Sequence, residues 1–301
     1  MENRKTALVT QTYRMDHDEC VLLCESIDRF APGLDHFIFV NDEDIAMFRH
    51  LEGGRRHVLP KSVVLPRHLI RVPFKILGHH FHVSPFTMPV REWIVQQICK
   101  LGVFDIIGDS YDAVYHYDSE VVMMKPWPDG GWMRDGSYPM YKVVNVDEPS
   151  HDDYIRAAIA RLGISAADTD EAARYCYMNV PVCFRRDNTR SLLDHIGRRH
   201  WSGSWKLALC NTYRFSEYYT YGIYTSLFLG GRGHYRVDTH PYPVVDISLI
   251  DNPETFRSHA AKFLSDPTVH GLWLQKRDRK NLASSYLPFN DIRRIVTSMW
   301  D

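Results

Sequence analysis

The N-terminal part of the chain alternates strand and helix patterns, and this order constrains the fold more than any other feature of the sequence. Residues 6–13 form a short run rich in β-branched side chains, which predicts a strand. Apolar residues recur at helical spacing over 20–30, and Pro32 and Gly33 would end that helix. Residues 35–42 predict a second buried strand that ends in polar residues. Strand, helix and strand in this order open an α/β sheet.

Weaker patterns continue the alternation along the chain. The sequence predicts strands over 58–65 and 111–124, the second interrupted by acidic residues, and a helix over 91–101. Beyond them it predicts helices over 151–162, 166–175, 190–198, 256–264 and 291–299, a helix or a long mixed segment over 215–229, and β structure over 180–184 and 237–250. We therefore expect one α/β, Rossmann-like domain over 1–301 with a mixed central sheet, divided into a nucleotide-binding half (about 1–130) and an elaborated second half (about 131–301).

The charge balance argues against a nucleic-acid-binding protein. The chain has 36 Lys and Arg against 37 Asp and Glu, whereas binding to a phosphate backbone normally needs a basic excess. No apolar run approaches the length of about 18 residues that a membrane span needs, and residues 6–10 are too short for the apolar part of a signal peptide. We therefore expect a cytoplasmic protein without a transmembrane segment. Its six cysteines lack CxxC spacing, which favours buried, reduced thiols over disulfides or zinc.

The most informative segment is Tyr117-Asp118-Ser119-Glu120. If it continues a strand, Asp118 and Glu120 project to the same side and Ser119 points away. Two carboxylates at a strand end suit Mg²⁺ or Mn²⁺, which take oxygen ligands and share them with diphosphate oxygens. An isolated Asp-x-Glu triplet more often simply begins a turn, so the motif alone leaves both interpretations open.

In its context the motif resembles that of nucleotide-sugar-dependent glycosyltransferases of the GT-A fold, of the bacterial polysaccharide type. The resembling parts are the first strand 7–13 with Asp16 and Asp18 after it, the second strand 37–42, the helix piece 93–100, and residues 115–126, which end in Lys125-Pro126. Order and spacing agree over roughly the first 130 residues, and the second half matches only loosely. The chain departs from the family's Asp-x-Asp motif at Glu120, which weakens the implied dependence on a metal.

The resemblance implies a hexosyltransferase that moves a hexose from a nucleoside-diphosphate sugar to a saccharide or polysaccharide hydroxyl with the help of Mn²⁺ or Mg²⁺. GDP-mannose is the first guess for the donor, with UDP-glucose and UDP-galactose as alternatives. The residues implied to bind the donor are Thr10, Gln11, Thr12, Asn41, Asp42, Gln97, Lys100, Asp118, Ser119 and Glu120. Asp118 and Glu120 are also the implied metal ligands, completed by His270 or, as its competitor, by His240.

An aromatic-dense stretch over 215–222 predicts the acceptor site. Aromatic rings with polar edges stack well on sugar rings, so an acceptor-binding wall is slightly favoured over core packing. Glu217 in this stretch is, with Asp118, the expected catalytic residue. It would act as the general base of an inverting enzyme, or in a retaining one it would stabilise positive charge on the donor sugar or orient the acceptor. The alternative is an acidic residue at a helix N-terminus capped by Ser216.

Other interpretations stay open. His79-His80-Phe81-His82 favours a loop over a zinc site, and the basic residues 276–280 fit either a loop that closes over the diphosphate or an exposed surface loop. Glu120 in place of Asp motivates a second hypothesis, a non-catalytic nucleotide-sugar-binding or glycan-binding protein on a degenerate scaffold. A metal-dependent hydrolase is a weaker third. The oligomeric state is open, a homodimer included, as is the stereochemical outcome.

Overall fold

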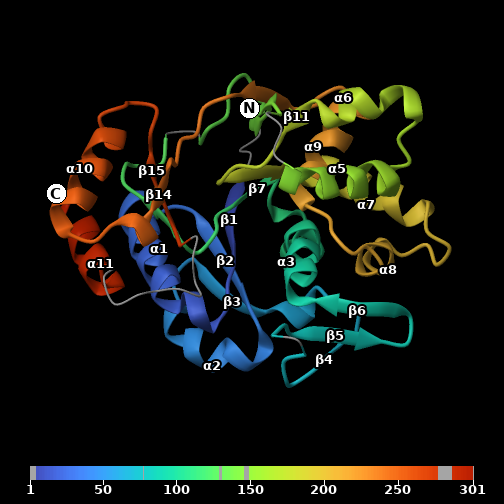
Figure 1. The fold of residues 1–301 in the computed structure, drawn as a ribbon, viewed down its shortest axis with the longest axis horizontal. Helices are drawn as coiled ribbons and strands as arrows, with labels where there is room; N and C mark the ends of the chain where they lie inside the picture. The colour runs from blue at the N-terminus through green and yellow to red at the C-terminus, as the bar shows by residue number, and fades with distance from the viewer. Residues whose placement is uncertain (1–4, 77, 129–130, 146–148, 277–286, 301) are drawn as a thin grey trace.

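A computed structural model of the chain describes residues 5–76, 78–128, 131–145, 149–276 and 287–300. At its centre lies a five-stranded sheet in the order β12-β7-β1-β2-β3 (Figure 1). Its strands are β1 (Thr6–Gln11), β2 (Asp35–Val40), β3 (Arg56–Pro60), β7 (Ala113–His116) and β12 (Val182–Arg185). The first four run parallel, and β12 pairs antiparallel with β7. The predicted α/β class with a mixed central sheet is confirmed.

The apolar run of β1 explains its central place. Ala7, Leu8 and Val9 are fully buried, as expected for a parallel strand that is covered on both faces. Helix α1 (His17–Phe30) follows β1 and buries Leu22 and Leu23. The helix ends at Phe30, where the backbone N–H of Ala31 donates to the carbonyl oxygen of Ile27, just before the predicted stop at Pro32.

The order of the strands creates a switch point beside β1. The chain places β2 and β3 on one side of β1, and then β7 and β12 on the other. The loops after β1 and β7 therefore leave the sheet in opposite directions at its carboxyl edge. In open α/β sheets, ligands bind in the crevice that forms at such a point.

The remaining elements surround this sheet. Helix α2 (Ile45–Phe48) lies between β2 and β3. Between β3 and β7 the chain forms β4 (Ile70–Arg71), β5 (Phe81–Ser84), β6 (Thr87–Arg91), α3 (Glu92–Leu101) and α4 (Phe104–Ile107). One group of helices packs beside α3: α5 (Pro149–Leu162), α6 (Thr169–Ala173), α7 (Arg186–Arg198), α8 (Trp205–Cys210) and α9 (Glu217–Leu227) (Figure 1). On the opposite side, α10 (Pro253–Leu264) and α11 (Phe289–Ser298) cover a small sheet of β14 (Val244–Asp246), β15 (Gly271–Gln275) and β8 (Val121–Met123). Two further strand pairs are β9 (Tyr138–Tyr141) with β13 (His234–Val237), and β10 (Val143–Val144) with β11 (Tyr175–Cys176).

The single strand predicted over 111–124 is wrong. Strand β7 ends at His116, and the backbone N–H of Val121 bonds to the carbonyl oxygen of Asp118 at 3.1 Å, which closes a turn. After the turn the chain continues as β8, which belongs to the small sheet with β15. The Asp-x-Glu motif therefore lies on a connection between two sheets, and the argument from strand alternation does not apply to it.

Several other predicted boundaries shift by a few residues. The third strand starts before residue 58 and ends at Pro60, the helix predicted over 166–175 is shorter because its end pairs as β11, and the β structure predicted over 237–250 divides between β13 and β14. The loop predicted around His79 in fact leads into β5 at Phe81. These segments are short, and their patterns of two to five residues cannot separate strand from turn.

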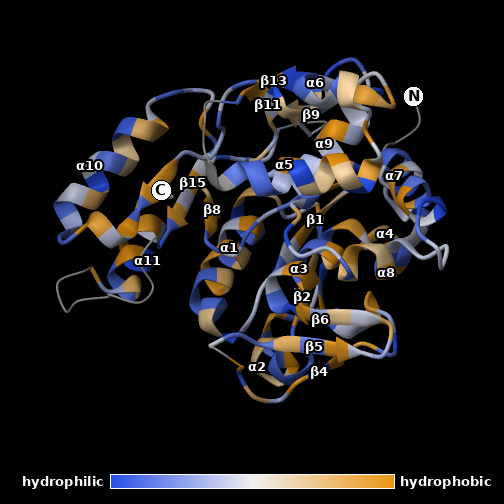
Figure 2. Ribbon diagram, turned by 45° about the vertical axis from the view of Figure 1, so that its right-hand side comes forward, coloured by the Kyte–Doolittle hydropathy of each residue, from blue (hydrophilic) through white to orange (hydrophobic). Residues whose placement is uncertain are grey.

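The aromatic stretch over 215–222 forms core rather than an acceptor wall. Phe215, Tyr219 and Tyr221 are buried in the cluster between α9 and the central sheet, and Tyr221 stacks on Phe184 of β12 with ring centroids 4.3 Å apart. Figure 2 shows α9 enclosed by neighbouring helices. Helix α9 thus stabilises the fold through most of its aromatic side chains.

The predicted burial of the cysteines is confirmed for five of the six, all of which are free in the structure, and their reduced state stays a prediction. Among the described residues, no helix combines the length and the apolar character that crossing a bilayer requires.

Candidate functional site

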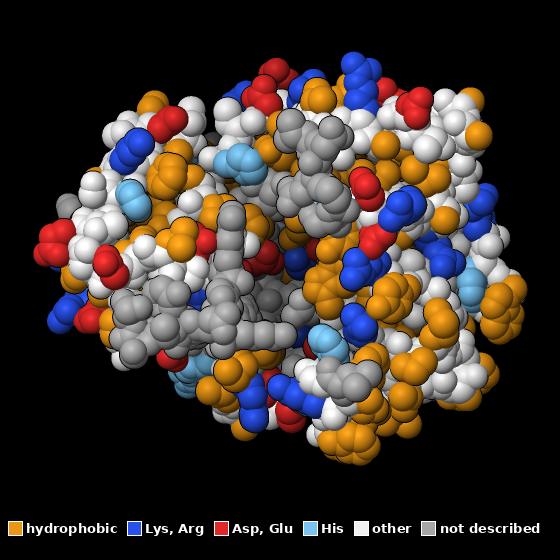
Figure 3. All heavy atoms as spheres, viewed as in Figure 1, with side chains coloured by type: hydrophobic (Ala, Val, Ile, Leu, Met, Phe, Trp, Pro, Cys, Tyr) orange, Lys and Arg blue, Asp and Glu red, His pale blue; other side chains and the backbone are white. Residues whose placement is uncertain are grey.

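A cleft of about 1130 Å³ opens at the carboxyl edge of the central sheet. It is lined by Gln11 at the end of β1, Asn41 just after β2, and the turn after β7 that carries Asp118, Ser119 and Glu120. Figure 3 shows the surface hollowed at this place, with acidic and basic side chains at its edge. The cleft therefore occupies the switch point that the strand order creates.

All three residues of the motif face this cleft. Ser119 lines it as well and is only 2% exposed, so the prediction that Ser119 points away from the two acids is wrong. The turn is anchored at its start, because the backbone N–H of Tyr117 bonds to the carbonyl oxygen of Val9 at 2.9 Å. The indole Nε1 of Trp273 on β15 donates to Glu120 at 3.4 Å from the far wall.

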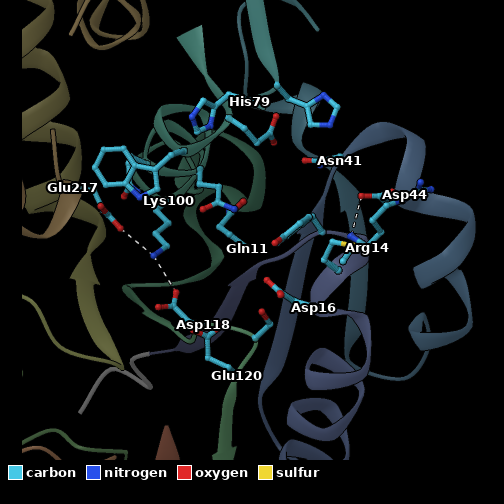
Figure 4. Close-up of a pocket in the computed structure, with 18 of the residues that line it drawn as sticks. Gln11, Arg14, Asp16, Asn41, Asp44, His79, Lys100, Asp118, Glu120 and Glu217 are labelled. Carbon is cyan, nitrogen blue, oxygen red and sulfur yellow. Dashed lines mark hydrogen bonds and ion pairs between the residues drawn. The ribbon is translucent and has the colours of Figure 1, made fainter. Parts of the chain in front are cut away.

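A buried lysine joins two carboxylates in the cleft. The ammonium of Lys100 on α3 lies 3.1 Å from Oδ1 of Asp118 and 3.0 Å from Oε1 of Glu217, and it donates to the hydroxyl of Tyr218 at 2.6 Å (Figure 4). Glu217 is the first residue of α9, which Ser216 caps by accepting a bond from the backbone N–H of Tyr219. The helix-cap interpretation of Glu217 is thus confirmed, yet Glu217 also lines the cleft.

Burial shifts the proton equilibria of this group. Burial alone would lower the pKa of Lys100, but the neighbouring carboxylates outweigh it and hold that pKa well above its usual value. For Glu217, which is 1% exposed, burial raises the pKa, and the charge of Lys100 opposes the shift only in part. The ammonium is therefore a fixed positive charge at the floor of the cleft.

Gln97 completes the group. With its amide oriented by its neighbours, the nitrogen donates to Oε1 of Glu217 at 2.7 Å and the oxygen accepts from Nε1 of Trp93 at 3.2 Å. Gln97 and Lys100 lie one turn apart on α3, so the same face of this helix holds the buried glutamate at two points.

The side-chain amide of Gln11 is buried without a hydrogen-bond partner. Gln11 is 6% exposed, it lines the cleft, and neither the oxygen nor the nitrogen of its side-chain amide has a hydrogen-bond partner. Buried amide groups are almost always paired, so an unpaired one that faces a cleft indicates a ligand. In Figure 4 Gln11 lies between Lys100 and Asp16, close to the middle of the site.

The other end of the cleft is held by ion pairs between its lining residues. Nε of Arg14 lies 2.9 Å from Oδ1 of the buried Asp44, and Arg71 of β4 pairs with both Glu43 and Glu92. These contacts tie the loops after β1 and β2 to the small β4–β6 sheet and α3. They give this end a fixed shape before any ligand binds.

Four of the predicted site residues do not line the cleft. Oγ1 of Thr10 bonds to Nε2 of His36 at 2.9 Å, Thr12 is buried, and Asp42 accepts from the backbone N–H of Ser62 at 3.2 Å. His270 packs its ring against Trp132 instead, with centroids 5.6 Å apart. The predicted residues that the structure brings together at the cleft are Gln11, Asn41, Gln97, Lys100, Asp118, Ser119, Glu120 and Glu217.

The alternative metal ligand His240 lies outside the cleft lining as well. His240, the competitor of His270, bonds to Asn179 and to Tyr141, each at 2.7 Å. Lys276 pairs with Glu19, and residues 277–280 of the basic cluster lie outside the described residues. Within the described ranges, no three His, Cys, Asp or Glu side chains come together as a group that could hold a metal ion.

Trp273 and Gln275 are among the lining residues that the sequence did not indicate. They lie two positions apart on β15 and therefore face the same side of that strand, toward the cleft. The alternation in Gly271–Gln275 was a usable signal for a strand, but only the pairing of β15 with β8 brings it beside the motif turn.

Residues 6–243 match a sequence family described as a family of unknown function, DUF6492. The chain belongs to the DUF6492 family. No curated protein matches this DUF6492 chain in sequence.

Solved glycosyltransferase structures are similar to the DUF6492 protein at low identity. GlyE from Streptococcus pneumoniae TIGR4 matches with a TM-score of 0.43 and 12% identity over 99% of this chain, which spans only 60% of the length of GlyE. The galactosyltransferase LgtC in complex with donor and acceptor sugar analogues gives a TM-score of 0.43 and 11% identity, with 98% of this chain and 95% of LgtC covered. The bifunctional glycosyltransferase WbbM gives 0.47 and 10%, with 98% and 50% covered. Similarity at this level carries no conclusion about activity, which has to be inferred from the site.

Proposed function

We propose that this DUF6492 protein is a glycosyltransferase that moves a hexose from a nucleoside-diphosphate sugar to a saccharide hydroxyl. One observation carries the proposal: two cleft-facing carboxylates, Asp118 and Glu120, lie at the switch point of the sheet beside the unpaired amide of Gln11. This combination suits a ligand that has a diphosphate and hydroxyl or amide groups to pair with Gln11.

The size and polarity of the cleft support two substrates. Pockets for a single small ligand measure about 300–1,000 Å³, and this cleft reaches about 1130 Å³. Gln11 offers one donor group and one acceptor group to a nucleotide base, a ribose or a sugar hydroxyl. Asn41 accepts from the buried ammonium of Lys61 at 2.7 Å, which leaves its amide nitrogen oriented for a second contact.

The acidic motif fits a metal ion that arrives with the diphosphate. Mg²⁺ is commonly held by one or two protein carboxylates plus substrate phosphates, and Asp118 and Glu120 would supply such a pair. When bound, the ion would offset the negative charge that develops on the leaving diphosphate. His270 as a third ligand stays a prediction, because its ring lies outside the cleft lining.

Lys100 and Glu217 support the chemistry from the floor of the cleft. Lys100 holds Asp118 in place and supplies a permanent positive charge near the position proposed for the diphosphate. Burial raises the pKa of Glu217, and a carboxylate with a raised pKa is a better general base near neutral pH. The proposal therefore assigns Glu217 to take the proton of the acceptor hydroxyl in an inverting reaction. Gln97 and Lys100 keep its carboxylate oriented.

The identities of the donor, the metal and the acceptor are parts of the proposal. GDP-mannose is the first donor to test, Mn²⁺ or Mg²⁺ is the metal, and the acceptor is a sugar or polysaccharide. A cytoplasmic location, a homodimer and the division of the chain at about residue 130 also stay predictions.

A thermal-shift panel tests the proposal first. It compares UDP-, GDP-, ADP- and dTDP-sugars with and without Mn²⁺ or Mg²⁺. A ligand at one hundred times its Kd stabilises the folded state by about 2.7 kcal/mol, which raises Tm measurably. We expect a metal-dependent rise with one nucleotide, followed by transfer to saccharide acceptors.

Variants of the motif sharpen the test. Asp118→Asn should keep the fold and lose both the metal-dependent shift and donor turnover. Asp266→Asn, a change at an exposed acid outside the cleft, should behave like the wild type. Unchanged turnover in Asp118→Asn would refute the role of Asp118. Donor binding without hydrolysis or transfer would favour the non-catalytic alternative.

A further inference from the structure

The β4–β6 sheet exposes a concentration of apolar side chains. Of the fifteen large hydrophobic residues exposed within the described ranges, six fall in the short span 70–88: Ile70, Phe74, Ile76, Val83, Phe86 and Met88. Figure 3 shows hydrophobic side chains gathered at the lower right, over the position of β4–β6 in Figure 1. Scattered apolar residues are normal on a surface, but a group of this kind marks a site of interaction.

The strand register explains why one face of this sheet is apolar and open. Ile70 of β4 lies opposite Val83 of β5, so both side chains point to the same face, and they are 66% and 41% exposed. The alternate residue His82 lies opposite Val90 of β6, and both are buried on the inner face. The sheet therefore packs one face onto the protein and leaves the other without a partner among the described residues.

The hairpin tip is held in place rather than free. The side-chain amide of Asn211, at the end of α8, accepts from the backbone N–H of Met88 at 3.0 Å and donates to the carbonyl oxygen of Phe86 at 3.3 Å. Phe86 and Met88 are nevertheless 52% and 54% exposed. Their side chains are thus presented outward on a fixed backbone.

Although the whole chain has a formal charge of only −1, the region around this sheet has an excess of positive charge. Residues 53–91 contain seven Lys and Arg and no Asp or Glu, so the rest of the chain, with 29 Lys and Arg against 37 Asp and Glu, carries a formal charge of −8. A segment with this composition has no acid of its own to offset its positive charge.

Four of these seven cations have carboxylate partners elsewhere, namely Arg55, Arg56, Lys61 and Arg71. Among the described residues, no carboxylate pairs with the remaining three, Arg67, Lys75 and Arg91. Arg91 lies 5.2 Å from the ring centroid of Tyr213, which is 62% exposed and extends the surface next to the sheet. The apolar face is therefore bordered by unpaired positive charge.

We propose that the outer face of the β4–β6 sheet binds the surface of an anionic lipid bilayer. Aromatic and aliphatic side chains can insert among the acyl chains at the bilayer surface, and the neighbouring Lys and Arg side chains can bind the acidic headgroups. A second copy of the chain is the poorer occupant. A two-fold interface brings the same patch of both copies together, so it would gather both sets of Arg67, Lys75 and Arg91 in one interface to which residues 53–91 contribute no acid.

Docking through this face positions the cleft at the bilayer. The connection between β4 and β5 supplies Lys75 and His79 to the cleft lining, while Phe74 and Ile76 on the same connection are exposed. The mouth of the cleft then lies beside the membrane surface, where an acceptor carried by a lipid is within reach. This inference goes beyond the proposed glycosyl transfer, and its test does not require that activity.

The test is cosedimentation of the purified full chain with lipid vesicles. One set consists of phosphatidylcholine alone, and the other mixes phosphatidylcholine with phosphatidylglycerol. We expect binding to the mixed vesicles that weakens with added salt, because the charges at this surface are screened. The double variants Phe86→Ser/Met88→Ser and Arg67→Gln/Lys75→Gln should each bind at least tenfold more weakly. For Arg67→Gln/Lys75→Gln this estimate rests on a loss of about fivefold in vesicle affinity for each cation removed near an anionic surface.

Matched controls exclude a general effect of exposed apolar residues. Trp201→Ser and Leu249→Ser remove side chains that are 80% and 79% exposed outside the β4–β6 sheet, and they should bind vesicles like the wild type. Unchanged circular dichroism and Tm show that each variant folds. Equal binding of the wild type and both sheet variants overturns the proposal, as does the absence of wild-type binding to mixed vesicles. A wild-type dimer in light scattering that Phe86→Ser/Met88→Ser dissociates overturns it in favour of a second copy.

Discussion

Replacing Lys100 with methionine probes the buried charge group at the floor of the cleft. Methionine keeps most of the side-chain volume but removes the ammonium that contacts Asp118 and Glu217. The side chain of Asp118 is 27% exposed and can still be hydrated by water. The side chain of Glu217 is 2% exposed, and without Lys100 only Gln97, of the described side chains, still donates a hydrogen bond to its carboxylate. Removing one partner of a buried ion pair costs about 3–5 kcal/mol. For a chain of this size that is a fall in Tm of about 5–8 °C.

The pH dependence of this loss has a definite sign. Burial raises the pKa of Glu217, and without Lys100 that pKa rises further. An acid with a raised pKa in the folded state binds its proton more tightly there than in the unfolded chain. It therefore favours folding at low pH, and this contribution is lost as pH rises from the unfolded pKa through the folded one. The deficit of Lys100→Met should thus be largest near pH 8 and should shrink toward pH 5.

The assay is urea denaturation followed by circular dichroism at both pH values. The double variant Lys100→Met/Glu217→Gln should recover most of the lost stability, because the amide carries no charge to leave unpaired. Lys206→Met is the matched control: Lys206 lies 3.1 Å from Asp105 in a partly exposed pair, so its loss should cost less than about 1 kcal/mol. A deficit that is independent of pH, or one that Glu217→Gln does not relieve, would refute the reasoning.

Two further predictions concern the surrounding fold. Burial holds the pKa of His116 well below its usual value, so the folded protein keeps this ring neutral, and the free energy of unfolding should fall as pH drops below about 6.5, where the unfolded chain gains the proton. In urea denaturation between pH 7.5 and 5, His116→Leu should make stability depend less steeply on pH. An unchanged pH dependence would contradict the role given to His116. A Cβ atom at Gly271 would overlap the carbonyl oxygen of Val122 and the ring of Tyr242, so Gly271→Ala should lower the free energy of unfolding by about 1–3 kcal/mol. The control Gly33→Ala places its Cβ in open space and should leave stability unchanged. Equal stability of both alanine variants would show that β15 adjusts without strain.

The sequence predicted the first half of the sheet because its patterns are long and unmixed. The fully buried run of β1, the helical spacing of α1 and the apolar core of β2 each span at least six residues, enough to separate periods of 2 and 3.6. At the ends of these strands the prediction was right only in part. Gln11 and Asn41 line the cleft, whereas Thr10, Thr12 and Asp42 beside them do not.

The other parts of the site depend on contacts that no local pattern contains. Glu217 meets Lys100 across 117 positions of sequence, and the sequence showed only a helix cap at one and a helix surface at the other. The aromatic residues around Tyr219 were interpreted as a wall because composition alone cannot distinguish a ring in the core from a ring in a cleft. The motif turn was interpreted as a strand because its apolar flanks, β7 and β8, belong to two different sheets.

Strand β15 sets the order in which the site can be completed during synthesis. The part of the chain that matches the family ends at residue 243, whereas β15 spans Gly271–Gln275 and is the strand that pairs with β8. Until β15 has emerged from the ribosome, β8 lacks its partner strand, and the motif turn before it lacks Trp273 and Gln275 across the cleft. A nascent chain therefore carries Gln11 and Asp118 without the β15 side of the cleft until residues 271–275 have been synthesised.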